Sequence, residues 1–199
     1  MSSSPLSRSE LAAALAPELL SLEAAALLPV GGSKKAGVLV PLFAADAGAL
    51  SVVMTRRGDQ LRRHAGELAF PGGRLDADDH DLSSAALREA HEEIGLAPLS
   101  VELLGALSPT PTIATDYAVH PFVGLIEPGQ EWIRSRREVA SIHEFEIAQL
   151  RAGYGRRVIK RRGISFTTDT YLVGDQLVWG ATARILGDLF ARLDAAGLS

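Results

Sequence analysis

The sequence predicts a single α/β (α+β) sandwich, and three features of its hydrophobic pattern support that fold class. Short β-rich runs fill much of the chain, and glycine or proline separates nearly all of them. One amphipathic helix is expected among these strands, and a second helix is expected near the end of the chain. With 199 residues and 47% hydrophobic side chains, the chain is long enough to bury one core but short for two domains.

The amino-terminal part is expected to form a helical extension over residues 1–35, followed by the main domain over residues 36–199. Ser9–Leu20 has the pattern of a short amphipathic helix with Ser9 as its N-cap. Gly31–Lys35 then has the composition of a linker. Acidic residues and a proline interrupt the first apolar stretch, so we expect no signal peptide. No run reaches the roughly 20 apolar residues that span a bilayer.

After this extension, the pattern indicates strands, a helix, further strands, a hairpin and a closing helix. Strands are predicted at Val38–Phe43, Leu50–Thr55, Glu67–Phe70, Val101–Leu107 and Ala118–Ile126, with a strand-like run at Ser141–Phe145. The helices are predicted at about Leu82–Ile94 and Ala181–Leu193, the second after a hairpin around Gly174–Asp175. Gly95 stands where a left-handed C-terminal helix cap belongs.

Charge and composition exclude several classes of function. The 20 basic and 24 acidic residues give a formal charge of −4, so no broad positive field draws the protein onto nucleic acid or an anionic membrane. The absence of cysteine excludes disulfides, thiolate metal sites and a thiol nucleophile. We therefore expect a cytoplasmic protein that binds neither nucleic acid nor a membrane, and the sequence leaves a homodimer open.

Three glutamates of the central helix are the strongest candidates for chemistry. At about 100° per residue, Glu89, Glu92 and Glu93 gather opposite the apolar face. Like charges four residues apart destabilise a helix by ~0.2–0.5 kcal/mol unless a cation offsets them. Arg88 reaches Glu92, but one guanidinium does not neutralise three carboxylates, and hard oxygen ligands suit Mg²⁺ or Mn²⁺. The preceding glycine pair lets backbone approach a ligand, so the Gly73 carbonyl is a further candidate ligand.

A solvated acidic helix face is the alternative, and it is what three such glutamates alone indicate. The full order of glycine pair, loop, Arg-Glu, Glu-Glu and glycine favours a metal site instead. In this order the stretch from Gly72 to Leu96 resembles the Nudix box. Its helix half matches at every fixed position. Its loop half is one residue longer than usual and carries Asp76, Asp78, Asp79 and Asp81 in place of a glutamate.

The resemblance implies the Nudix α/β/α sandwich with a mixed β-sheet, to which the chain adds an N-terminal helix and a closing C-terminal helix. It also implies roles on the central helix. Glu89, Glu92 and Glu93 would bind the metal ions, Gly73 would lend its carbonyl, and Arg88 would orient the carboxylates by salt bridging.

Upstream, Thr55–Gly73 is similar to a second signature, which marks the coenzyme A diphosphatase branch of that family. The matching positions are Thr55, Arg57, Leu61, Arg62, His64, Gly66 and Phe70–Gly73. The resemblance implies that Arg57, Arg62, His64 and Gly66 bind substrate, with Arg56 and Arg63 ranked below them. Guanidinium groups suit phosphate oxygens, although single arginines near strand ends are often only exposed charges.

Two further groups are candidates for substrate contacts. The basic runs Arg156–Arg157 and Lys160–Arg162 would hold a 3′-phosphate or line a subunit contact, although a solvated hairpin is the simpler interpretation. Trp132, Phe166, Tyr171 and Trp179 would stack on adenine, although aromatic side chains usually belong to the core.

The implied reaction is metal-dependent hydrolysis of the diphosphate of coenzyme A or its thioesters, which gives (acyl-)4′-phosphopantetheine and adenosine 3′,5′-bisphosphate. A carboxylate must deprotonate the attacking water. The candidates are Glu93, Glu127, Glu131, Glu138 and Glu144, and Glu138 is favoured because it precedes the strand-like run at 141–145. Two alternatives remain. One is a Nudix pyrophosphatase for another nucleoside diphosphate derivative, such as ADP-ribose or a dinucleoside polyphosphate, and the other is a non-catalytic nucleotide-binding Nudix module.

Overall fold

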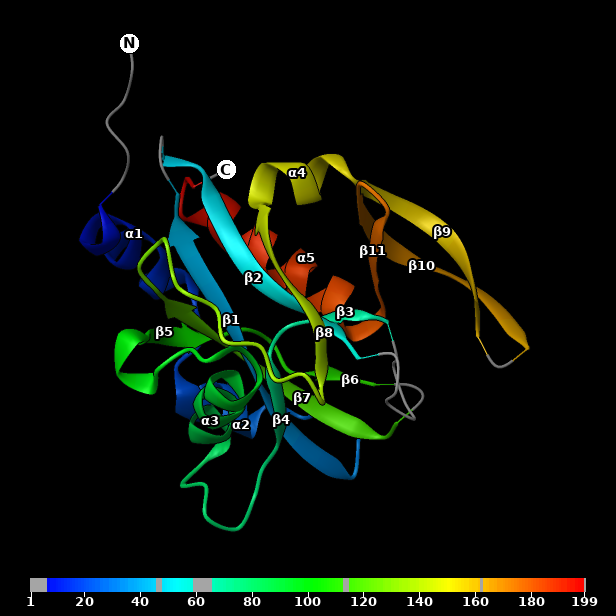
Figure 1. Ribbon diagram of the computed structural model, residues 1–199, viewed down its shortest axis with the longest axis horizontal. Helices are drawn as coiled ribbons and strands as arrows, with labels where there is room; N and C mark the ends of the chain where they lie inside the picture. Colours follow the sequence, from blue (N-terminus) through cyan, green and yellow to red (C-terminus); the bar gives the residue numbers. More distant parts are fainter. Residues whose placement is uncertain (1–6, 46–47, 59–65, 113–114, 162, 199) are drawn as a thin grey trace.

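A mixed β-sheet forms the centre of the protein in a computed structural model that describes residues 7–45, 48–58, 66–112, 115–161 and 163–198 (Figure 1). The strands of this sheet are β1 (Lys34–Ala44), β2 (Leu50–Arg57), β3 (Leu68–Ala69), β4 (Gly72–Arg74), β5 (Glu102–Ala106), β6 (Thr110–Pro111), β7 (Tyr117–Leu125) and β8 (Val139–Glu146). The long strand β1 pairs parallel with β7 and antiparallel with β2 and β4. The mixed sheet predicted from the sequence is therefore confirmed.

A second, three-stranded sheet and the helices complete the molecule. The sheet consists of β9 (Tyr154–Arg161), β10 (Ile164–Val173) and β11 (Gln176–Trp179), in the order β11-β10-β9. The helices are α1 (Arg8–Leu15), α2 (Leu22–Leu27), α3 (Leu82–Ile94), α4 (Ile147–Ala152) and α5 (Gly180–Ala195), with 3-10 turns η1 (Ala16–Glu18) and η3 (Pro98–Ser100). None of the helices in the described ranges combines the length and the apolar character that crossing a membrane requires.

Helices cover both faces of the mixed sheet, and the alternation of side chains along β1 explains why (Figure 1). Val40 and Leu42 join the core under α5, whereas Leu39 and Phe43 join the core under α3. The α3 side of that second core is formed by Ala86, Ala90 and Ile94. An α/β sandwich follows, and it confirms the predicted fold class.

The amino-terminal helix differs from its prediction in both its cap and its length. Ser7, not Ser9, is the N-cap, because the Ser7 hydroxyl accepts from the Glu10 backbone N–H and Glu10 reaches back to the Ser7 N–H. The α-helix ends at Leu15, and the next turn, which contains Pro17, is a 3-10 helix. Leu11 and Leu15 are buried in the same core as α5, and the proposed boundary at residue 35 stays a prediction.

The central helix α3 spans the predicted residues. Asp81 caps its first turn by accepting from the Ser84 N–H at 2.8 Å. Gly95 ends it in the left-handed region at φ 76°, as the sequence predicts. The position of the three glutamates on the molecule is therefore set by two local caps and one apolar face.

The second sheet was only partly predicted. The hairpin around Gly174–Asp175 is confirmed, because Val173 pairs with Gln176. The β9–β10 hairpin contains the basic run Arg156–Arg157, for which a solvated hairpin or loop was the simpler interpretation, and it projects beyond the rest of the molecule in Figure 1. Side chains along β9 alternate between exposed and half-buried positions, and a strand of that kind, rich in arginine, has the composition of a solvated loop.

Candidate metal and active site

Three carboxylates meet at the carboxyl-terminal end of α3. Glu89 and Glu93 come from α3, and Glu138 comes from the segment that enters β8. Each offers one oxygen atom, and these atoms lie within 4.8 Å of one another. In the part of the chain that the structure describes, no other group of acidic or histidine side chains has such an arrangement. We call Glu89, Glu93 and Glu138 the carboxylate group.

Glu93 is the buried member of the carboxylate group, with 4% of its surface exposed. Burial raises the pKa of its carboxyl to about 7, although Arg57 and the Gly72 N–H favour the charged form. The Gly72 N–H donates to Glu93 Oε2 at 3.3 Å, and Arg57 Nη1 lies 3.9 Å from Oε1. These partners only partly replace the water that Glu93 has lost, so a cation beside it would stabilise its charge.

Glu89 lies directly against the glycine pair of β4. A Cβ atom at Gly73 would collide with both oxygens of the Glu89 carboxylate, so only glycine allows this close approach. Burial raises the pKa of Glu89 as well, and Arg88 opposes the shift. The contact brings the Gly73 backbone next to the carboxylate group, while a role for its carbonyl as a ligand stays a prediction.

Glu138 is brought to α3 by a loop that caps the carboxyl-terminal end of the helix. The Ser135 N–H donates to the Glu93 carbonyl at 2.9 Å, and the Ile133 N–H donates to the Ile94 carbonyl at 3.0 Å. The Gly58 N–H at the end of β2 donates to the Glu138 carbonyl at 2.8 Å. The structure therefore places the favoured candidate for the general base beside Glu89 and Glu93, from a distant part of the sequence.

Arg88 connects the helix to the loop that precedes it. Its Nε and Nη2 donate to the two oxygens of Asp79 at 2.9 and 3.0 Å, a bidentate pair. Its Nη1 lies 3.2 Å from Glu89 and 3.3 Å from Glu92. The Asp79 side chain is 5% exposed, and the Arg88 guanidinium lowers the pKa of its carboxyl.

Asp79 is the residue that the sequence left unassigned among the four aspartates of the loop. The signal was present, because a loop acid close in sequence to the helix arginine is positioned to pair with it. The spacing alone did not select Asp79 from its neighbours, however. Only the folded loop, in which the Asp76 N–H donates to Asp79 at 2.8 Å, distinguishes it.

Glu92 does not join the carboxylate group in this structure. Its side chain is 54% exposed and contacts Arg88. The three glutamates were expected on one face, yet Glu93 is buried, Glu89 is half-buried and Glu92 is exposed. The reason is that β4 and the 133–138 loop cover only the Glu89–Glu93 side of the helix.

The other candidate residues are distributed as follows. Arg62 and His64 lie outside the described residues, whereas Gly66 sits at the start of the segment that leads into β3 and accepts a left-handed φ of 72°. Among the remaining candidates for the general base, Glu127 pairs with Arg8, Glu144 accepts from Trp132 Nε1 at 2.7 Å, and Glu131 is exposed.

The aromatic candidates separate into core and surface residues. Tyr171 is buried, with its ring edge-on to Phe190 and the centroids 5.4 Å apart. Trp132 packs beside the α3 core. Phe166 of β10 and Trp179 of β11 lie beside each other, with ring centroids 6.3 Å apart. The Arg161 guanidinium of β9 lies over the Trp179 ring.

The carboxylate group has the chemistry of a divalent cation site. It offers hard oxygen donors alone, and the chain has no cysteine to supply thiolate. Burial raises the pKa of Glu89 and of Glu93, so a cation bound beside them would favour their charged forms. Mg²⁺ and Mn²⁺ both fit these donors.

Comparisons with known proteins point to one family. The model of the NUDIX domain matches residues 33–162. The uncharacterized Nudix hydrolase NudL of Salmonella paratyphi B is 40% identical over 158 residues, which cover 78% of this chain and 81% of the relative. Among solved structures, a MutT/nudix family protein from Enterococcus faecalis has a TM-score of 0.54 at 17% identity, covering 96% of this chain and 76% of that chain. The Nudix hydrolase RenU from M. smegmatis has a TM-score of 0.52 at 20% identity, covering 67% of this chain and 81% of that chain.

Proposed function

The chain belongs to the Nudix hydrolases, which act on phosphorus-containing anhydrides, and from this premise we propose that its substrate is coenzyme A or a thioester of it. Hydrolysis of the diphosphate would give 4′-phosphopantetheine, or its acyl form, and adenosine 3′,5′-bisphosphate. Enzymes of this family generally use divalent metal ions, and the carboxylate group provides oxygen ligands for one.

One observation carries the choice of coenzyme A. Arg57, which belongs to the upstream signature of the coenzyme A diphosphatase branch, lies 3.9 Å from Glu93 of the Nudix box. The two signatures therefore meet at one place in the fold. A guanidinium at this position is suited to hold a phosphate oxygen beside the carboxylate group.

The residues of the chain divide the work of the proposed reaction. When bound, divalent cations neutralise the diphosphate and lower the pKa of a water molecule. Glu89 and Glu93 would bind the cations through their carboxylate oxygens, and Arg57 would orient the diphosphate. Glu138 accepts a proton from the water, whose oxygen forms a bond to phosphorus as the anhydride P–O bond breaks. The electron pair of that bond leaves with the departing phosphate.

Arg88 and Asp79 act through the carboxylate group rather than on the substrate. The bidentate pair fixes the guanidinium, and the guanidinium in turn contacts Glu89 at 3.2 Å. Preorganised carboxylates need no rearrangement when charge develops in the transition state. We therefore place Arg88 as a positioning residue within the proposed site.

A substrate panel tests the proposal directly. The purified protein is incubated with coenzyme A, acetyl-coenzyme A, ADP-ribose and diadenosine tetraphosphate, in Mg²⁺, in Mn²⁺ and in excess chelator. We expect the highest kcat/KM for coenzyme A or its thioester and no turnover in chelator. A higher kcat/KM for ADP-ribose or the dinucleotide would overturn the substrate assignment. Undiminished turnover in chelator would overturn the metal-dependent mechanism.

A further inference from the structure

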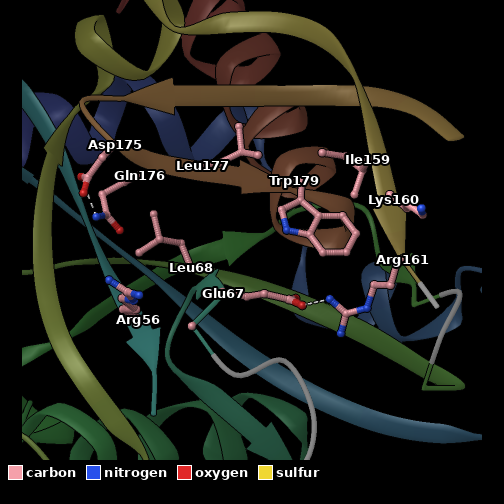
Figure 2. A pocket seen from close by; sticks show the side chains of 11 residues that line it. Arg56, Glu67, Leu68, Ile159, Lys160, Arg161, Asp175, Gln176, Leu177 and Trp179 are labelled. Carbon is pink, nitrogen blue, oxygen red and sulfur yellow. Dashed lines mark hydrogen bonds and ion pairs between the residues drawn. The ribbon is translucent and has the colours of Figure 1, made fainter. Parts of the chain in front are cut away.

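A cavity of about 580 Å³ lies between the mixed sheet and the three-stranded sheet (Figure 2), and its lining includes no member of the carboxylate group. We call it the hairpin cavity. One wall comes from the end of β2 and from β3, with Arg56, Glu67 and Leu68. The opposite wall comes from β9 and β11, with Arg161, Gln176 and Trp179. This volume is within the range of about 300–1,000 Å³ that is usual for small-molecule sites.

The hairpin cavity contains a flat wall that is fixed before any ligand binds. The Arg161 guanidinium carbon lies over the Trp179 ring, 5.1 Å from its centroid. Glu67 forms an ion pair with the same guanidinium, and Phe166 supports the indole from the side. An indole and a guanidinium held in this way form the kind of surface on which heteroaromatic bases stack.

The hairpin cavity contains both hydrogen-bond donors and hydrogen-bond acceptors. Arg56 is half-buried and brings its guanidinium to the wall of the cavity, although its Nε atom is itself buried and has no hydrogen-bond partner within the described residues. At the same end of the view in Figure 2, the Gln176 amide donates to Asp175 at 2.8 Å. A purine ring presents acceptor nitrogens and exocyclic groups that match this mixture.

The charges in the hairpin cavity favour a neutral ring over an isolated phosphate. Arg56 and Arg161 are offset by Glu67 and Asp175. The Lys160 side chain is exposed and points away from the cavity in Figure 2. A phosphate would have to compete with Glu67 for Arg161, whereas a base stacks on the pair without breaking it.

Two consecutive arginines at the end of β2 face the two sites. Arg57 turns towards Glu93, while Arg56 lines the cavity. Successive side chains of a strand point to opposite faces of a sheet, so the cavity lies on the α5 face of the mixed sheet and the carboxylate group on the α3 face. A substrate that reaches both sites must therefore pass around the end of β2.

From these contacts we infer that the hairpin cavity binds the purine base of the nucleotide half of the substrate, stacked on the Trp179–Arg161 pair. The inference rests on the proposed function for the nucleotide that it names, and the residues of β9 and β11 that it uses, Arg161, Gln176 and Trp179, lie outside both family signatures. It assigns a purpose to Arg56, Arg161 and Trp179 that the carboxylate group does not require.

Fluorescence of Trp179 tests this inference without any need for turnover. The chain has two tryptophans, so Trp132→Phe leaves Trp179 as the sole emitter. This variant is titrated, in Mg²⁺, with adenosine 3′,5′-bisphosphate and separately with 4′-phosphopantetheine, which has no base. We expect saturable quenching with the first probe and none with the second, because only the first stacks on the indole.

Two arginine substitutions in the Trp132→Phe background form a matched pair of test and control. Arg56→Gln should weaken the binding of adenosine 3′,5′-bisphosphate by about tenfold, since it removes a charged guanidinium from the wall of the cavity. Arg156→Gln makes the same charge change on the outer face of β9, where the side chain is 68% exposed, and should leave binding unchanged. Circular dichroism confirms that each variant is folded.

The outcomes separate this inference from the proposed function. If coenzyme A is hydrolysed but adenosine 3′,5′-bisphosphate leaves Trp179 emission unchanged, the inference is overturned and the proposed function stands. If Arg56→Gln and Arg156→Gln weaken binding equally, the effect is general electrostatics and the inference is again overturned. Saturable, Arg56-dependent quenching in a protein that does not hydrolyse coenzyme A would support the cavity and refute the substrate.

Discussion

The carboxylate group and the hairpin cavity differ in how closely their charged side chains are paired with opposite charges. In the carboxylate group, Glu93 is buried with the Arg57 guanidinium 3.9 Å away, and burial raises the pKa of the carboxyl to about 7. In the hairpin cavity, Arg161 is paired with Glu67 and stacked on Trp179. Carboxylates whose negative charge is only partly compensated favour binding of a cation. A guanidinium that is already paired with a carboxylate favours binding of a neutral ring.

The largest expected effect comes from neutralising the buried member of the carboxylate group. Glu93→Gln should lower kcat by at least about a thousandfold, because the cation loses a charged ligand while the shape of the side chain is kept. Glu92→Gln, at an exposed position that contacts Arg88, should cost less. Steady-state kinetics with coenzyme A measure both. An equal fall in kcat in the two variants would contradict the different roles assigned to the buried and the exposed glutamate.

Glu138→Gln should have the next largest effect. We expect kcat to fall by about 10²–10⁴-fold, because Glu138 would no longer take a proton from water. The matched control is Glu144→Gln, in the same segment, where the carboxylate accepts from Trp132. Glu144→Gln should keep a kcat close to that of the wild type. A Glu138→Gln enzyme with the wild-type kcat would show that another group is the base.

Asp79→Asn should have an intermediate effect through Arg88. Loss of one charged partner from the bidentate pair should lower the free energy of unfolding by about 1–3 kcal/mol and kcat by about tenfold. Urea denaturation and kinetics measure the two effects. Asp78→Asn, one residue earlier in the same loop and at an exposed position, is the control. If both variants resemble the wild type, Arg88 is positioned by other contacts.

The stability of the metal-free protein should depend on pH through Glu93. The folded pKa of about 7 is above the ordinary value of 4.5, so the contribution of Glu93 to the stability of the metal-free protein is fully present below pH 4.5. It falls as the pH rises from 4.5 to about 7 and is lost above that pH. Mn²⁺ or Mg²⁺ compensates the charge, so it should raise the melting temperature more at pH 8 than at pH 5. Thermal denaturation with and without metal measures the difference. The same increase at both pH values would contradict the role of Glu93.

The smallest effect is expected in the hairpin cavity. Arg56→Gln should raise the KM for coenzyme A several-fold with kcat nearly unchanged, because base binding is lost equally from substrate and transition state. Arg156→Gln should match the wild type in both constants. A fall in kcat without a change in KM would show that Arg56 acts on the reaction at the carboxylate group, and not on binding of the base in the cavity.

The sequence predicted the carboxylate group better than the hairpin cavity, and the reason is the distance along the chain over which each is assembled. Glu89 and Glu93 are one helical turn apart, and Gly95 marks the end of that helix, so local periodicity locates both glutamates. Glu138 could be favoured from its position before a strand. Asp79 could not be selected, because its pairing with Arg88 depends on the folded loop.

The hairpin cavity could not be predicted because its walls come from segments far apart in the sequence. Arg56 was ranked below Arg57, and the side of the strand that each would face was not visible. The basic run at Arg161 had the composition of a solvated hairpin, and Trp179 that of a core residue. Pairing of β9 with β10 and of β10 with β11 is what brings Arg161 to Trp179.

The central claim is that Glu89 and Glu93 bind a divalent cation beside the substrate phosphate. Anomalous diffraction from crystals soaked in Mn²⁺ with adenosine 3′,5′-bisphosphate tests it most directly, because the anomalous scattering of Mn²⁺ locates the ion. The account predicts an anomalous peak about 2.0–2.5 Å from carboxylate oxygens of Glu89 and Glu93, next to a phosphate of the ligand. A peak elsewhere on the protein, with Glu89 and Glu93 free of metal, would contradict it.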